Sequence, residues 1–317
     1  MVMRIPEEKE VLSYFDSLSN WGRWGDDDQK GTLNLIDANK TLESIKIPTR
    51  GKTVSCSRTI IGGEVAPDIP NPPVHFMLES GEGWESGKKI TSRKTQGAID
   101  YIGMIFHGYS VTHIDSPAHF FWEGKMFNGI PAHYVSTNLG ATAGSVELVR
   151  EGLITRGVLI DVPMIRNIDW LERGTGVMPE DILEAEKQCG FTIEPGDVLL
   201  VRTGQYHRRK IEGPANPLEA GSTACHAASL PLFREKDIAM LGSDTGNDIQ
   251  PPPYPSLPQP IHQIGIVGMG LWILDNANLE DLARTCREYN QWHFMFVLSP
   301  LIIKGGTGSP ANPLALF

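Results

Sequence analysis

The stretch that most constrains this chain is His107-Gly-Tyr-Ser-Val-Thr-His113-Ile-Asp115-Ser-Pro117-Ala-His119, which holds three of the nine histidines. His113 and Asp115 are two residues apart, so in an extended strand both side chains point to the same face. Pro117 ends such a strand, and a turn there brings His119 back over that face. We therefore expect three polar side chains to converge where a strand ends.

His107 stands six residues before His113. A fully extended chain at about 3.3 Å per residue would separate the two by about 20 Å, too far for one metal ion. Gly108 suits the positive φ of a turn, so we expect His107 to fold back as a further ligand. From spacing alone, a histidine-rich loop that satisfies its own hydrogen bonds is the alternative.

Imidazole and carboxylate ligands suit Zn²⁺, Mn²⁺ or Fe²⁺ and not the all-oxygen cage of Ca²⁺, and we expect zinc or manganese. Such an ion lowers the pKa of a bound water from 15.7 toward about 7 and polarises a carbonyl group. The chemistry predicted is metal-dependent hydrolysis. A P-loop, a G-x-S-x-G elbow and a G-x-G-x-x-G motif after a strand are absent, which argues against nucleotide or serine-nucleophile chemistry.

Thr112-His113-x-Asp115-x-Pro117-x-His119 resembles the end of the pattern H-x-G-T-H-x-D-x-P-x-H of the cyclase-like metal-dependent hydrolases, a family that includes kynurenine formamidase and isatin hydrolase. The front of the pattern differs, because strict spacing would require histidine at Tyr109 and glycine at Val111. A two-residue insertion would leave His107 and Gly108 in those places, as in the longer members of the family.

The resemblance implies a swivelling β/β/α-type α/β fold with a mixed sheet and flanking helices, assembled as a homodimer or larger homo-oligomer. It also implies a second metal site, for which His262 and Asp275 are candidates. Asp275-Asn276 is similar to the family's Glu-Asn, with a shorter carboxylate. Two alternatives stay open: His262 is an ordinary loop histidine, or the protein holds one ion instead of two. His119 resembles the general acid/base, with a metal-ligand role as the alternative.

The function expected is cleavage of a C–N bond in a cyclic amide or N-acyl small molecule, such as a formamide, by an amidohydrolase. A lactone or ester hydrolase is the alternative enzyme, since the metal ligands do not define the leaving group. A non-catalytic protein that binds a metal or small molecule is the alternative of a different class. Trp24, in a turn-rich loop, is a candidate substrate contact.

Composition limits the other classes of function. The formal charge is −10, and no block of Lys or Arg indicates nucleic-acid binding. We expect no secretory signal, because residues 1–10 lack a continuous apolar stretch, and no membrane span, because the longest apolar run, Ile264 to Leu274, is too short. The prediction is a soluble cytoplasmic protein. Four scattered cysteines predict buried free thiols without disulfides.

Short apolar segments alternate with helical patterns, which predicts one mixed α/β domain over residues 1–317, with 1–50 as an N-terminal helical and loop extension. The proline-rich tract 250–260 must be extended, either as a linker or, as we favour, as a loop over the site or at a subunit contact. The predicted strands are Lys52–Ile60, Ala98–Phe106, Gly157–Val162, Asp197–Arg202, Ile238–Leu241 and Phe294–Ile303. The predicted helices are Glu7–Leu18, Pro179–Gly190 and Leu279–Tyr289.

Overall fold

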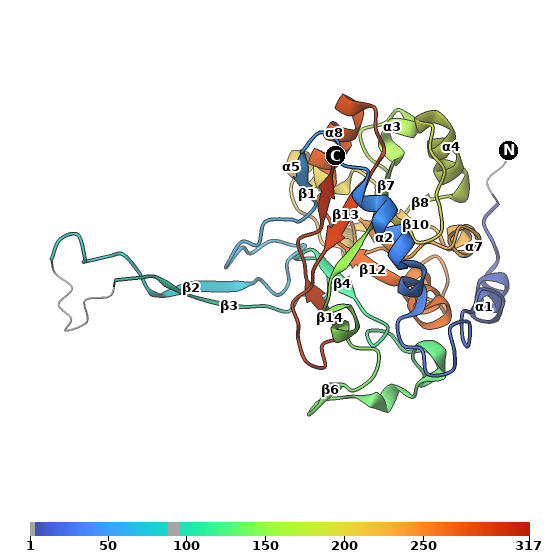
Figure 1. The fold of residues 1–317 in the computed structure, drawn as a ribbon, viewed down its shortest axis with the longest axis horizontal. Helices are drawn as coiled ribbons and strands as arrows, with labels where there is room; N and C mark the ends of the chain where they lie inside the picture. Colours follow the sequence, from blue (N-terminus) through green and yellow to red (C-terminus); the bar gives the residue numbers. More distant parts are fainter. Residues whose placement is uncertain (1–3, 88–95) are drawn as a thin grey trace.

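The computed structural model describes residues 4–87 and 96–317, so the first three residues of the segment inspected for a signal lie outside it. Its main feature is a nine-stranded mixed sheet in the order β1-β15-β13-β7-β9-β11-β12-β4-β14 (Figure 1). The strands of this sheet are β1 Thr53–Ser55, β4 His113–Asp115, β7 Leu153–Asp161, β9 Val198–Arg202, β11 Met240–Ser243, β12 Trp272–Asp275, β13 His293–Leu298, β14 Gly308–Pro310 and β15 Leu314–Leu316.

The four central strands β7, β9, β11 and β12 are parallel, and the pairs outside them are antiparallel. These central strands are buried on both faces, as their runs of Val, Leu and Ile predict. The predicted mixed α/β fold with flanking helices is confirmed. Sheet order, which the sequence does not reveal, brings β4 beside β12, so that His113 lies opposite Asp275 in the register.

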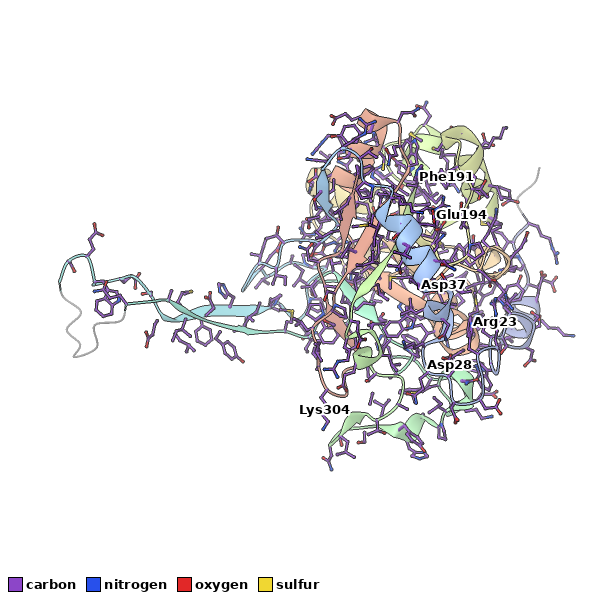
Figure 2. The ribbon with its side chains drawn as sticks, viewed as in Figure 1. Arg23, Asp28, Asp37, Phe191, Glu194 and Lys304 are labelled. Atoms are coloured by element: carbon purple, nitrogen blue, oxygen red, sulfur yellow. The ribbon has the colours of Figure 1, made fainter. Side chains whose placement is uncertain are left out.

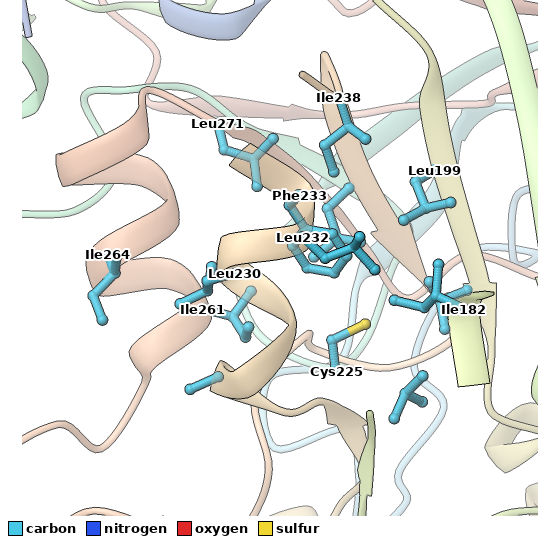
Figure 3. Close-up of a cluster of buried hydrophobic side chains, with 14 of the residues drawn as sticks. Ile182, Leu199, Cys225, Leu230, Leu232, Phe233, Ile238, Ile261, Ile264 and Leu271 are labelled. Carbon is cyan, nitrogen blue, oxygen red and sulfur yellow. The ribbon is translucent and has the colours of Figure 1, made fainter. Parts of the chain in front are cut away.

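Two hydrophobic clusters cover the two faces of the sheet. Alternate residues of β9 divide between them, because successive side chains of a strand point in opposite directions: Leu199 belongs to one cluster and Leu200 to the other. Figure 3 shows the first cluster, where Ile182, Leu199, Phe233 and Ile261 come together from helices and a strand. Burial on both faces fixes the positions of the strand ends that carry the site.

The helices follow the predicted patterns closely. Pro at the first turn and Gly190 at the left-handed cap, with φ of 70°, delimit the helix predicted over Pro179–Gly190. The helices are α1 Glu8–Ser17, α2 Ala38–Ile45, α3 Val162–Arg166, α4 Pro179–Cys189, α5 Gln205–Glu212, α6 Pro217–Ala220, α7 Leu230–Glu235, α8 Glu280–Tyr289 and the π-helix η6 Ile261–Met269. The short 3-10 turns are η1 Gly31–Leu35, η2 Phe127–Gly129, η3 Ala132–Tyr134, η4 Val146–Val149 and η5 Ala227–Ser229.

One predicted strand lies outside the main sheet. Within Ala98–Phe106 the chain forms β3 Ile99–Gly103, whose partner in the described part of the chain is β2 Val74–Glu79. This hairpin projects from the body as a long arm (Figure 1), and its apolar side chains stand out on both sides of it (Figure 2). The remaining short pairs are β5 Val135–Ser136 with β6 Gly140–Ala141 and β8 Gly176–Val177 with β10 Ala224–Cys225.

Other expectations can be compared directly with the structure. All four cysteines are free, as predicted; Cys56, Cys225 and Cys286 are buried, whereas Cys189 is partly exposed. The proline-rich tract is not extended throughout as predicted, because it turns where the Leu257 amide donates to Tyr254 O at 3.2 Å. It packs against the N-terminal segment: Tyr254 Oη donates to Pro6 O at 3.0 Å, and the Ser256 amide donates to Glu8 Oε1 at 2.6 Å. Among the residues that the structure describes, no helix has the length and apolar character needed to cross a bilayer.

Candidate metal centre

The first part of the site is the short strand β4, which lies between β12 and β14. Because the strand is extended, His113 and Asp115 point to the same face, and their Nε2 and Oδ1 atoms are 3.6 Å apart. Both side chains are buried. The His113 ring is held by a 2.9 Å hydrogen bond between Nδ1 and Val111 O, which leaves Nε2 directed at Asp115.

His107 reaches the same carboxylate through the turn that the sequence predicts. Gly108 has a φ of 115°, a conformation open to glycine and strained for other residues. The turn is fixed by Asn276, whose Nδ2 donates to Gly108 O at 2.6 Å. As a result His107 Nδ1 lies 2.8 Å from Asp115 Oδ1, while Nε2 hydrogen bonds with Thr307 Oγ1 at 3.0 Å.

His119 returns to the site after the break at Pro117. Its amide donates to Ser116 O at 2.9 Å, closing the turn. The ring stacks on His107 with centroids 3.8 Å apart, and Nε2 lies 3.9 Å from Asp115 Oδ2. The edge of the Phe120 ring lies against His119, with centroids 4.9 Å apart, so an apolar wall stands beside this imidazole.

The second part of the site comes from the C-terminal half of the chain. His262 lies in the first turn of η6, and Asp275 is the last residue of β12. His262 Nε2 is 3.5 Å from Asp115 Oδ2 and 3.6 Å from Asp275 Oδ2. Asp115 therefore stands between two groups of possible metal ligands. We call the five residues His107, His113, Asp115, His262 and Asp275 the Asp115 cluster.

Two further residues orient this part of the cluster. Asp248 accepts a 2.6 Å hydrogen bond from His262 Nδ1 and another of 2.9 Å from the Ile261 amide, so the Nε2 atom is left facing the centre. Asn247 Nδ2 donates to Asp275 Oδ1 at 2.7 Å. Sequence analysis did not identify either residue, although both follow a buried strand in a polar loop, the signal that could have found them.

The electrostatics of the cluster follow from burial and close opposite charges. Burial raises the pKa of Asp115, but His119, His113 and the other imidazoles outweigh it and hold that pKa well below its usual range. Burial lowers the pKa of His262, but Asp275 and its other acidic neighbours raise it well above the ordinary value. For His119, burial dominates and lowers the pKa to about 4, against the opposing effect of Asp115.

The ligand atoms of the Asp115 cluster fit a divalent cation. Asp115 is fully buried, yet neither carboxylate oxygen makes a hydrogen bond of acceptable geometry, and His107 Nδ1 also has no hydrogen-bond partner. A buried carboxylate without donors is costly unless a cation compensates it. The ligand atoms of His107, His113 and Asp115 lie within 4.8 Å of one another, and so do those of Asp115, His262 and Asp275. Nitrogen and carboxylate donors suit Zn²⁺ or Mn²⁺.

Trp24 is not brought to this cluster by any contact of the described residues. The guanidinium of Arg23 lies 4.8 Å from the centre of its ring, and Trp24 is not among the residues that line the cavity beside the cluster. Its role as a substrate contact stays a prediction. By contrast, the Phe120 ring does lie beside the cluster, with its centroid 4.9 Å from that of His262.

Comparison with known proteins identifies relatives of this fold. The family model Cyclase matches residues 59–247, more than half of the chain. A crystal structure described as a novel cyclase has 27% sequence identity and a TM-score of 0.85, covering 95% of this chain and 100% of that one. No curated protein sequence matches the chain.

More distant solved structures share the fold. Isatin hydrolase A from Labrenzia aggregata, bound to benzyl benzoate, has 24% identity and a TM-score of 0.55, covering 83% of this chain and 93% of that one. Isatin hydrolase A from Ralstonia solanacearum has 19% identity and a TM-score of 0.57, covering 83% and 91%. The resemblance carried by residues 112–119 is confirmed, and this chain belongs to the Cyclase family.

Proposed function

We propose that this protein is a metal-dependent hydrolase that cleaves a C–N bond in a cyclic amide or N-acyl small molecule. The observation that supports this most is the buried Asp115 carboxylate, which makes no hydrogen bond of acceptable geometry within the described residues and stands between two groups of nitrogen and oxygen ligands. The names of the isatin hydrolases that share the fold are consistent with this reaction class.

In this proposal His107, His113 and Asp115 hold one divalent cation, and Asp115, His262 and Asp275 hold a second. Zinc or manganese is the expected metal, because both accept imidazole together with carboxylate. A cation bound there supplies a water of lowered pKa and polarises the substrate carbonyl.

His119 moves the proton. Its Nε2 atom lies near the ligands without belonging to either group, and its lowered pKa of about 4 keeps the imidazole neutral at pH 7. A neutral imidazole accepts a proton from water and can return it to the leaving nitrogen, so that the C–N bond breaks to give an acid and an amine. Phe120 places an apolar ring beside His119, whose side chain is 22% exposed and so can exchange protons with water.

The test is turnover of a substrate panel by protein loaded with Zn²⁺ or Mn²⁺. The panel contains matched N-formyl amines, cyclic imides, lactones and aryl esters, and the His119→Ala variant serves as the control for catalysis by free metal. The proposal predicts that amides turn over and that chelation abolishes turnover. Turnover restricted to lactones or esters would contradict the C–N assignment, and absence of turnover with every metal would favour a binding protein.

A further inference from the structure

A cavity adjoins the Asp115 cluster, and the Tyr109 ring forms part of its wall. The same wall includes Gly246 and Asn276, and Asn276 directly follows the candidate ligand Asp275. A methyl group added at Gly246 would lie 2.8 Å from the Tyr109 ring and 3.7 Å from Asp275 Oδ2. The ring and this carboxylate are therefore neighbours across Gly246, and a molecule in the cavity can contact both.

Tyr109 belongs to the turn that begins at His107, and its backbone is fixed there. Gly108 O accepts a 2.6 Å hydrogen bond from Asn276 Nδ2, and Tyr109 O accepts one of 3.1 Å from Arg58 Nη1. The Tyr109 ring is therefore held by the contacts that also bring His107 back to the site.

The Tyr109 hydroxyl is free to donate a hydrogen bond. Neighbouring donors are already engaged, because Asn276 Nδ2 holds the turn and Thr245 Oγ1 shares a 3.1 Å hydrogen bond with Ser243 Oγ. In the described part of the chain, Tyr109 Oη makes no hydrogen bond, and it is not one of the buried polar atoms that lack a partner. The hydroxyl is therefore open to solvent and available to a ligand.

Nearby charges show that the phenol lies in the electrostatic field of the cluster. Burial raises the pKa of Tyr109, and the charges of Asp275 and Asp248 raise it further. His262 acts in the opposite direction. Because an unperturbed phenol ionises only near about pH 10, the hydroxyl carries its proton at neutral pH. The group is thus a neutral hydrogen-bond donor beside the candidate metal ligands.

We propose that Tyr109 is a further catalytic residue, whose hydroxyl donates a hydrogen bond to the carbonyl oxygen of the bound amide. When water adds to the carbonyl carbon, the C=O π electrons move to this oxygen. The phenol O–H stabilises the negative charge that develops there and keeps its own proton. The C=O bond forms again as the C–N bond breaks, and the leaving nitrogen takes its proton from His119.

This inference rests on the proposed hydrolysis for the reaction, and a binding experiment tests the contact itself. Methyl phenylphosphonate is a tetrahedral anion that resembles the hydrolytic intermediate, and N-methylbenzamide is a planar amide of similar size. Titration calorimetry measures the affinity of each for Mn²⁺-loaded protein and for its Tyr109→Phe variant, which keeps the ring and removes only the hydroxyl. Tyr134→Phe is the matched control, because Tyr134 is 43% exposed and lies outside the cavity.

We expect Tyr109→Phe to weaken binding of the phosphonate about tenfold to a hundredfold, because a hydrogen bond to a charged oxygen is lost. Binding of the amide should change by a smaller factor, and Tyr134→Phe should change neither. Equal phosphonate affinity of the parent and Tyr109→Phe, or no binding of the phosphonate by the parent, would overturn the inference. So would loss of the bound metal from Tyr109→Phe, which would give the hydroxyl a structural role.

Turnover of the amides in the substrate panel gives a second readout. Tyr109→Phe should lower kcat about 10²-fold and change KM much less, because the hydrogen bond strengthens only as the oxyanion forms. An unchanged kcat would contradict the catalytic role. If phosphonate binding depends on Tyr109 but the parent protein hydrolyses no amide, the hydrogen-bond donor stands and the proposed hydrolysis fails.

Discussion

Two clusters of buried charge lie at the carboxyl ends of the central strands, and they are built in opposite ways. In the first, Arg202 bridges Asp161 at 2.7 Å and Glu280 at 2.9 Å, and Arg287 contacts the second oxygen of Asp161 at 2.7 Å. We call these four residues the Arg202 cluster. Its cations and anions satisfy one another, as expected of a structural network.

The Asp115 cluster lacks this internal balance. Its central carboxylate is as deeply buried as Asp161, yet in the described part of the chain its oxygens make no hydrogen bond of acceptable geometry and are surrounded by imidazoles instead of Arg or Lys. Burial of charge is therefore not the mark of a functional site in this protein. The unpaired buried oxygen distinguishes the cluster that requires a ligand from the cluster that holds the fold together.

The sharpest test of this difference is to neutralise the central carboxylate of each cluster. Asp115→Asn removes a ligand common to both candidate metal sites, so we expect loss of the bound metal and a fall of activity to background, the largest effect of any substitution considered. Asp161→Asn should keep the metal. Elemental analysis of both purified variants measures this, and a metal content of Asp115→Asn equal to that of the unmodified protein would break the comparison.

Next in size is the effect of His119, which lies beside the Asp115 cluster and outside both ligand groups. His119→Ala should lower kcat by about 10² to 10⁴, because a positioned general acid/base contributes about that much. Metal content should not change. Steady-state kinetics together with metal analysis decide the matter, and parallel loss of metal and rate would instead make His119 a ligand.

Removal of Arg202 should lower the stability of the fold and leave metal binding unchanged, the reverse of what is expected for Asp115→Asn. Arg202→Met leaves Glu280 without its cation and Asp161 with one cation instead of two, so we expect the free energy of unfolding to fall by about 3–5 kcal/mol. Urea denaturation measures this value, and metal titration of the folded variant should match the parent protein. Unchanged stability would show that the Arg202 cluster does not stabilise the fold.

The smallest of these effects concerns the residue that orients His262. Asp248→Asn weakens the 2.6 Å contact with Nδ1 and should reduce metal affinity about 10- to 100-fold while the other ligands remain. Competition with a fluorescent chelator gives the affinity. An unchanged metal affinity would mean that the position of His262 in η6 orients its imidazole without help from Asp248.

Local sequence patterns predicted the front of the candidate site well. The two-residue spacing of His113 and Asp115, the break at Pro117 and the freedom of Gly108 are all properties of a short segment, and the structure shows the turn and the shared face that they imply. The family resemblance suggested His262 and Asp275. Their ligand roles, like the catalytic role of His119, stay predictions.

Long-range arrangement set the limit of what could be predicted. The pairing of β12 with β4 depends on sheet order, which has no local signal, and the contact of Asp248 with His262 joins residues on either side of the proline-rich tract. The strand within Ala98–Phe106 was correct as a strand, but the sequence did not show that it would pair with β2 outside the main sheet, with its apolar residues exposed. The single-domain boundaries, cytoplasmic location and homo-oligomeric state also stay predictions.

The most direct measurement of the central claim is a crystal structure of Zn²⁺- or Mn²⁺-loaded protein with anomalous diffraction recorded at the metal edge. We predict an anomalous peak among His107, His113 and Asp115, and a second peak among Asp115, His262 and Asp275 when both ions are bound. Crystals of metal-loaded protein with no anomalous density in contact with Asp115 would contradict the account.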